Sequence, residues 1–169
     1  MERINFRTDI LPLKNKLFRL ALRITLDSAE AEDVVQETMI RIWEKQEELL
    51  RVDSIEAWCL TVCRNLALDK QALKASQVVE LNETLHDKPG QSSPHEELVN
   101  QERMAIVNQL FNELPLPQRE VIHLRDIEGK SYKEIASLLS LTEEQVKVNL
   151  FRARQKIREQ FKDIENYGL

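Results

Sequence analysis

Apolar residues recur along this chain at every third or fourth position, the spacing that places them on one face of an α-helix. Together with the residues that start and stop helices, this pattern predicts an all-α fold. We expect helices over residues 9–24, 28–49, 54–75, 94–113, 118–128, 131–139 and 142–158.

The first four predicted helices each have an apolar face. These faces are formed by Leu13, Leu17, Leu20, Ala21 and Ile24; by Val35, Met39, Ile42 and Trp43; by Trp58, Val62, Leu66 and Leu73; and by Val99, Ile106, Val107, Leu110 and Phe111. Because Trp58 repeats with Val62 on a single stripe, we interpret it as a core residue rather than a platform for stacked bases.

The periodicity stops between residues 77 and 94, where prolines, a glycine and serines interrupt the pattern. We interpret this stretch as a flexible linker. It divides the chain into two small helical domains, residues 1–76 and 95–169. A capping box formed by Ser93 and Glu96 is predicted to open the first helix of the second domain.

Two further capping boxes place a pair of helix starts eleven residues apart in the second domain. The pairs are Ser131 with Glu134 and Thr142 with Gln145, in which hydroxyl, carboxyl and amide groups bind backbone amides at a helix start. Only two residues separate the end of the first helix from the second cap, so the two helices must cross steeply. This predicts a helix-turn-helix, preceded by Gly129 as the left-handed end of an earlier helix.

The second helix of this unit is strongly basic. From Lys147 to Lys162 it carries six cations and one acid, so its charge is six minus one, or +5, on a chain of net charge −5. A basic run is often only a solvated helix face, but its position after the turn favours nucleic-acid binding. Because the whole chain is acidic, we expect weak binding to free DNA, with affinity supplied by dimerisation or by a larger partner.

The remaining chemistry argues against an enzyme or a metalloprotein. Cys59 and Cys63 lack the further ligands of a structural zinc site and are predicted to be buried free thiols. The sequence has no nucleophile with a matched base and no phosphate-binding glycine loop, so no catalysis, cofactor or metal is expected. No apolar run is long enough to span a membrane and no secretory signal is present, so a cytoplasmic location is expected.

Three segments resemble, in the same order, segments of the extracytoplasmic-function (ECF) group of sigma-70-family sigma factors. They are AEDVVQETMIRIW, EAWCLTVCRNLALD and LPLPQREVIHLRDIEGKSYKEIASLLSLTEEQVKVNLFRARQKIR. The resemblance covers nearly the whole chain except the linker. It implies that the first domain is similar to sigma region 2 and the second to sigma region 4.

The resemblance implies that the protein binds core RNA polymerase and directs it to promoter DNA, while catalysis belongs to the polymerase. It places the docking surface for core polymerase on the second predicted helix, at Asp33, Val34, Gln36, Glu37 and Arg41. An anti-sigma factor that covers one or both domains is a further implied partner.

The same resemblance implies two DNA-reading surfaces. The −10 element would be captured and read by Arg51, Asp53, Ser54, Arg64, Asn65, Asp69, Lys70 and Lys74. The −35 element would be read in the major groove by Ser131, Tyr132, Lys133, Gln145, Lys147, Val148, Phe151, Arg152, Arg154 and Lys156. The second domain would also pack on the polymerase flap.

The chain departs from the family in the second helix of the helix-turn-helix. Val148 and Asn149 stand where family members commonly have a serine and an arginine, and Phe151 stands where they have a histidine. The −35 preference therefore does not transfer from the family. Two other hypotheses stay open: a stand-alone helix-turn-helix regulator that dimerises on a palindrome, and a sigma-like adaptor that lacks promoter recognition.

Overall fold

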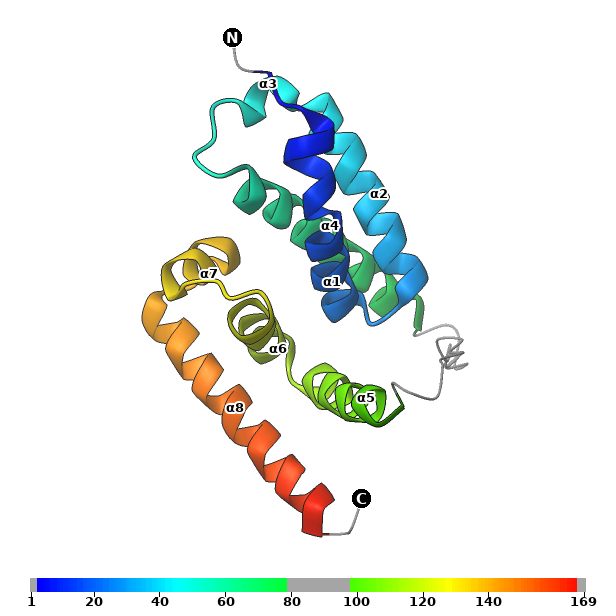
Figure 1. The fold of residues 1–169 in the computed structure, drawn as a ribbon, viewed down its shortest axis with the longest axis vertical. Coiled ribbons are helices and arrows are strands. Elements are labelled where there is room, and N and C mark those ends of the chain that lie inside the picture. The colour runs from blue at the N-terminus through cyan, green and yellow to red at the C-terminus, as the bar shows by residue number, and fades with distance from the viewer. Residues whose placement is uncertain (1–2, 79–97, 167–169) are drawn as a thin grey trace. The chain divides into compact units, whose positions relative to one another are not determined.

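The computed structural model describes residues 3–78 and 98–166, and every regular element within these two ranges is a helix (Figure 1). The chain divides into two compact units, Met1–Asp87 and Lys88–Leu169. The all-α prediction is confirmed. The predicted linker and the capping box at Ser93 lie outside the described residues, except that Gln77 and Val78 belong to the last helix of the first domain.

The first domain is a bundle of three main helices with a short helix at one end (Figure 1). Its elements are a π-helical turn at Phe6–Ile10, a 3-10 turn at Leu11–Leu13, α1 (Lys14–Thr25), α2 (Ser28–Glu44), α3 (Gln46–Leu49) and α4 (Ile55–Val78). Helices α1, α2 and α4 each pack against the other two. The three helices therefore share one core.

Side-chain caps explain where these helices begin. The Asp27 carboxylate accepts the amide of Glu30 at the start of α2, at 3.0 Å, and the Ser54 hydroxyl accepts the amide of Ala57 at the start of α4, at 3.1 Å. The chain turns helical earlier than predicted, because Asn5 rather than Asp9 caps the first turn. Pro12 lies in the 3-10 turn before α1, where its missing amide leaves no helical hydrogen bond unmade.

The core of the first domain matches most of the predicted apolar positions. The fully or nearly fully buried side chains on its three main helices are Leu17, Leu20, Ala21, Ile24, Ala31, Val34, Val35, Ile42, Cys59, Leu60, Cys63, Leu66 and Ala67. Burying each leucine or isoleucine contributes roughly 1.5 to 3 kcal/mol. The Cys63 thiol donates to the Leu17 carbonyl at 3.3 Å, so this polar group is satisfied inside the core.

Three predictions for the first domain are wrong in detail. The second helix does not run unbroken to residue 49, because it ends at Glu44 and Lys45 leaves helical geometry before α3 begins. Trp43 is not on the packed face: it is 63% exposed, and its ring meets Phe6 edge-on with 5.8 Å between centroids. Leu73 is 61% exposed, so it does not belong to the packed face of α4.

The second domain consists of α5 (Leu98–Glu113), α6 (Leu116–Ile122), a π-helical turn at His123–Ile127, α7 (Tyr132–Leu139) and α8 (Glu143–Asn166). Helix α8 packs against α5, α6 and α7. The buried side chains of this domain include Leu110, Phe111, Leu114, Val121, Ile122, Leu124, Ile135, Leu139, Val146, Leu150 and Ala153. Helix α8 therefore holds the domain together along its apolar stripe.

The break before α6 is shorter than the sequence predicts. The helix begins at Leu116 rather than Gln118, because Pro117 fits the first turn of a helix, where no amide donor is needed. The following π-helical turn ends at Ile127, and Gly129, two residues later, has φ of 68°. This confirms Gly129 as the left-handed residue before the helix-turn-helix.

Both capping boxes of the helix-turn-helix are present. The Ser131 hydroxyl accepts the amide of Glu134 at 3.1 Å, and the Thr142 hydroxyl accepts the amide of Gln145 at 3.1 Å. In return, the side chains of Glu134 and Gln145 accept the amides of Ser131 and Thr142. The two helices start where the sequence predicts, and α7 packs against α8.

Ser140 ends α7 in the left-handed region, with φ of 55°, where a side chain is strained and glycine is not. We expect Ser140→Gly to stabilise the second domain by about 1 kcal/mol. The measurement is hydrogen exchange of the α7 and α8 amides. Ser137→Gly is the matched control, because Ser137 is exposed within α7 and should lose roughly 0.5 kcal/mol on the same change. Shifts of the same sign in both variants would contradict this explanation.

Candidate docking and nucleic-acid interfaces

The outward face of α2 carries four of the five predicted docking residues. Asp33, Gln36, Glu37 and Arg41 are all exposed, and they recur at helical spacing on the side away from the core. Ile40 lies among them and is 57% exposed. The prediction of Val34 as a docking residue is wrong, because its side chain is fully buried in the core and supports this face from within.

Ion pairs along α2 are long and solvent-exposed. Glu37 lies 3.6 Å from Arg41 on the same helix, and Asp33 lies 3.8 Å from Lys70 of α4. Pairs of this kind contribute about 0 to 1 kcal/mol. The acidic groups of this face therefore remain available to a partner at little energetic cost.

The residues predicted to capture the −10 element meet at the start of α4. Arg51, Asp53 and Ser54 are exposed in the turn between α3 and α4. The Ser54 hydroxyl already accepts the amide of Ala57, so its main role in this structure is to cap the helix. Arg51 and Asp53 are the groups of this turn that can reach a ligand.

The residues predicted along α4 do not form one surface. Asn65 and Asp69 are exposed on the side opposite the core. Lys70 and Lys74 continue the face of α4 that carries the buried Cys63 and Ala67, so they face α2. There Lys70 pairs with Asp33, and Lys74 lies 3.8 Å from Glu30. Arg64 lies between these two sets and is half-buried.

Helix α8 presents a basic outward face between Lys147 and Lys156. Val146, Leu150 and Ala153 are buried against the rest of the domain, while Lys147, Val148, Phe151, Arg152, Gln155 and Lys156 are exposed. Gln145 is also exposed, although its amide oxygen takes part in the capping box. A helix of this kind after a tight turn suits the major groove of DNA.

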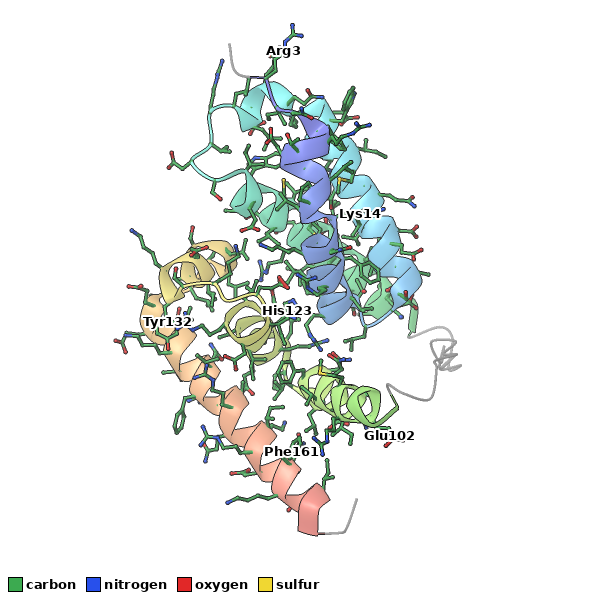
Figure 2. All side chains as sticks on the ribbon, viewed as in Figure 1. Arg3, Lys14, Glu102, His123, Tyr132 and Phe161 are labelled. Atoms are coloured by element: carbon green, nitrogen blue, oxygen red, sulfur yellow. The ribbon has the colours of Figure 1, made fainter. Side chains whose placement is uncertain are left out.

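The ring of Tyr132, on α7 (Figure 2), contacts two cations beside this face, one from the π-helical turn and one from α8. The Arg125 guanidinium lies over the ring at 4.6 Å from its centroid, and the Lys147 ammonium lies at 5.7 Å. Arg125 also donates to the Lys130 carbonyl at 2.9 Å. Tyr132 is therefore a positioning residue for a basic cluster, to which the exposed Lys133 of α7 adds a further charge.

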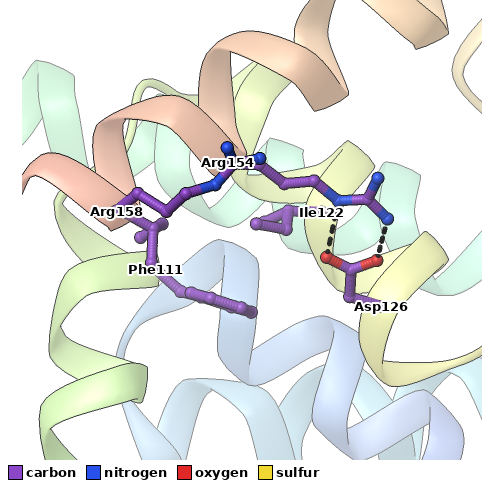
Figure 3. Close-up of a pocket in the computed structure, with 6 residues that line it drawn as sticks. Phe111, Ile122, Asp126, Arg154 and Arg158 are labelled. Carbon is purple, nitrogen blue, oxygen red and sulfur yellow. Dashed lines mark hydrogen bonds and ion pairs between the residues drawn. The ribbon is translucent and has the colours of Figure 1, made fainter. Parts of the chain in front are cut away.

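Arg154 is turned away from the outward face and held by the π-helical turn (Figure 3). Its guanidinium donates twice to the Asp126 carboxylate, at 2.6 and 3.2 Å. The hydrogen bond to Asp126 raises the pKa of Arg154 above its ordinary value. Arg154 stays a predicted DNA contact, but in this structure its guanidinium is paired with Asp126 and holds α8 against the π-helical turn.

A cleft of about 320 Å³ lies beside this ion pair, lined by Phe111, Ile122, Asp126, Arg154, Ile157 and Arg158 (Figure 3). Phe111 and Ile122 form its apolar floor, and the arginines of α8 form one wall. The ion pair thus closes one side of a groove between α8 and the preceding helices.

Both domains match models of known protein regions. Sigma-70 region 2 matches residues 10–76, and Sigma-70 region 4 matches residues 104–157. The chain is also similar to the ECF RNA polymerase sigma factor SigL of Mycobacterium tuberculosis. The two are 35% identical over 143 residues, which is 84% of this chain and 80% of SigL. This chain belongs to the ECF RNA polymerase sigma factors.

Two other comparisons agree with this assignment. The probable RNA polymerase sigma factor RfaY of Xanthomonas campestris is 31% identical over 86% of this chain, which spans 37% of that longer relative. The solved structure of the sigma factor RpoE of Bartonella quintana has a similar fold, with a TM-score of 0.75 and 24% identity. That likeness covers 93% of this chain and 96% of RpoE.

As an ECF sigma factor, the protein directs RNA polymerase to promoters for transcription initiation. The α2 and α4 surfaces lie within the match to region 2, and the helix-turn-helix lies within the match to region 4. The structure exposes four of the five predicted docking residues together on α2, and the predicted −35 residues lie on α7, its N-cap and α8, with Arg154 turned toward Asp126. It separates the predicted −10 residues into a group before α4, a group on the exposed side of α4 and a group that faces α2, with Arg64 between the last two.

Three residues on or beside these surfaces were missed by sequence reasoning: Ile40 and Gln155 are exposed, and Arg125 is half-buried. Ile40 follows Gln36 and Glu37 at helical spacing, but it reads as a core residue until its exposure is known. Arg125 lies before the predicted helix-turn-helix, and only the fold brings it to Tyr132. Gln155 follows Phe151 by four residues on the outward face of α8, a spacing that could have identified it.

The two cysteines confirm the prediction of buried free thiols and predict a pH dependence of stability. Burial raises the pKa of both thiols from 9.0 to about 12. Above pH 9 the unfolded chain loses these protons while the folded chain keeps them, so stability should fall by about 1.4 kcal/mol per thiol per pH unit. Both tryptophans, Trp43 and Trp58, lie in the first domain, so tryptophan fluorescence during urea unfolding reports on that domain alone.

We expect the sigma factor to lose about 2 to 3 kcal/mol more between pH 8 and pH 10 than a Cys59→Ala, Cys63→Ala variant. Each protein is compared with itself at the two pH values, so any packing loss in the variant cancels. Equal losses in both proteins would assign the pH dependence to other groups.

Within the described ranges, no helix is both long and apolar enough to cross a membrane. Across the same residues, no group of three or more histidine, cysteine, aspartate or glutamate side chains is arranged to hold a metal ion. His123, the one histidine among the residues that the structure describes, is buried in the core of the second domain (Figure 2).

Proposed function

We propose that this sigma factor docks on core RNA polymerase through the outward face of α2 and reads promoter DNA through α4 and the helix-turn-helix. The observation that carries the proposal is the exposed Ile40, which lies on α2 between the polar Gln36 and Glu37 and the exposed Trp43. Exposed apolar residues bordered by polar and charged groups have the anatomy of an interface centre.

The division into domains supports this assignment of roles. We infer boundaries at residues 1–76 and 95–169, so that the docking surface and the −35 reading helix belong to separate units joined by a linker. Two weak contacts joined by a linker gain affinity when one partner engages both, because the second contact becomes effectively intramolecular. This accounts for a promoter-reading protein whose net charge is −5.

The turn before α4 is the place we assign to capture of an unstacked −10 base. Arg51 and Asp53 are exposed there, and Asn65 and Asp69 continue along the outward side of α4. Holding an unstacked base in a pocket repays a few kcal/mol of unstacking by close contact. Lys70 and Lys74 face α2 and are left out of this assignment.

An anti-sigma factor is the regulatory partner we propose. RpoE of Bartonella quintana was solved in complex with the anti-sigma factor NepR, and CnrH, which is similar to this chain with a TM-score of 0.66, was solved with the cytosolic domain of CnrY. Such a partner would cover the exposed faces of one or both domains. We assign no catalytic step to the sigma factor itself, and we place it in the cytoplasm with the polymerase.

The test is run-off transcription by bacterial core polymerase from a library of random promoter sequences, with and without the purified protein. The proposal expects new transcripts, from a shared promoter class, only when both proteins are present. Gel-shift assays on the same library distinguish this proposal from the two alternative functions. Binding without core polymerase would support a stand-alone regulator, and binding of core polymerase without initiation would support an adaptor.

A further inference from the structure

An apolar pair lies at the centre of the outward face of α8. Val148 is 43% exposed and Phe151 is 65% exposed. At about 100° per residue, both point nearly opposite to the buried stripe of Val146, Leu150 and Ala153, about 60° from one another. They therefore occupy the positions that a helix in the major groove turns toward the base edges.

Cations flank this pair on both sides. Lys147 lies on one edge of the outward face, and Arg152 and Lys156 lie on the other, all of them exposed. With one cation on one edge of the apolar centre and two on the other, this face can meet the two phosphate backbones that border a major groove. Charge complementarity thus favours DNA, rather than the apolar surface of another protein, as the occupant of this face.

The neighbouring amide groups are already engaged within the helix. The Asn149 side chain donates to the Gln145 carbonyl at 2.9 Å, and the Gln145 side chain accepts the Thr142 amide at 2.9 Å. Arg154 is held by Asp126. The side chains left to meet the bases at the centre of this face are Val148 and Phe151, with the exposed Gln155 one turn further along the helix.

We propose that Val148 and Phe151 determine the −35 preference by packing on thymine methyl groups. The thymine methyl is the apolar group that a major groove presents, and apolar side chains are its usual partners. The inference rests on the proposed function, because it needs the helix-turn-helix to enter the −35 element. It adds the chemical class of base that the helix selects.

The experiment uses the holoenzyme and a promoter that it selects from the random library. Each thymine of the −35 element is replaced in turn by deoxyuridine, which lacks only the methyl group, and binding is measured by competition. For at least one position, we expect about fourfold weaker binding, the value of one buried methyl group. Holoenzyme that carries Val148→Ala or Phe151→Ala should no longer distinguish the two templates. It should bind the deoxyuridine template and its thymine parent with equal affinity.

Arg152→Ala is the matched control, since it removes a cation beside the pair. It should weaken binding to the thymine and deoxyuridine templates by the same factor. Transcription initiation by the wild-type holoenzyme on the thymine template is measured first. If it failed, the proposed function and this inference would both be overturned. Initiation with equal binding of thymine and deoxyuridine templates would overturn the inference alone. The inference would also be overturned if the Phe151→Ala variant bound core polymerase more weakly and still distinguished the thymine template from the deoxyuridine template. Val148 and Phe151 would then contact protein and not DNA.

Discussion

Replacing Asp33 and Glu37 together by alanine is expected to weaken binding to core RNA polymerase by about 100-fold. Both carboxylates flank Ile40 on the outward face of α2, and a partner that buries Ile40 must also meet them. Their present ion pairs are long and exposed, so the substitutions should change the stability of the first domain by less than about 1 kcal/mol. The measurement is a fluorescence titration of labelled protein with core polymerase.

The matched control for this titration is Glu47→Ala with Glu48→Ala. These two acids are also exposed in the first domain, but they lie on α3 and away from Ile40. The control removes the same charge and should leave the affinity for core polymerase within about twofold. If both double variants lost affinity equally, the effect would belong to the overall charge of the domain and not to the α2 face.

Replacing Lys147 and Arg152 by alanine is expected to lower the affinity of the holoenzyme for promoter DNA by roughly 10-fold to 100-fold. Both cations are exposed and border the apolar centre of α8. If each neutralises one phosphate, the slope of log affinity against log salt should become shallower by about 2. The measurement is promoter binding at several salt concentrations, with core polymerase held in excess.

The control for this second experiment removes two positive charges from the first domain, through Arg7→Ala with Lys14→Ala. Both residues are exposed there. The net charge of the protein changes by the same amount as in the Lys147 and Arg152 variant, while α8 stays intact. An equal loss of salt dependence in the control would show that long-range charge, and not contact by α8, governs promoter binding.

Local signals explain why the helix-turn-helix could be predicted from the sequence. Capping boxes act within four residues, so Ser131 and Thr142 specify both helix starts without reference to the rest of the fold. Gly129 likewise marks a backbone conformation that most side chains avoid. Elements defined by such local chemistry are confirmed to within a few residues.

The failures come from packing between elements distant in the sequence. Val34 was predicted on the docking surface and is buried, whereas Trp43 was predicted on the apolar face and is exposed. The reason is that the face of α2 that packs against α1 and α4 includes Val34 and not Trp43. Arg154 reads as one more cation of a basic helix until the fold brings Asp126 to it from 28 residues away. Periodicity finds an apolar face, but it does not fix the direction of that face when valine and isoleucine residues occur on both sides.

The most direct test of the account uses a photo-crosslinking side chain, benzoylphenylalanine, in place of Ile40 or of Phe151. Both residues are exposed, so either replacement should leave the fold intact. In the complex of core polymerase, sigma factor and promoter, the account predicts that position 40 crosslinks to a polymerase subunit and position 151 to DNA near the −35 element. Capture of DNA by position 40, or of polymerase by position 151, would contradict the assignment of docking to α2 and promoter reading to α8.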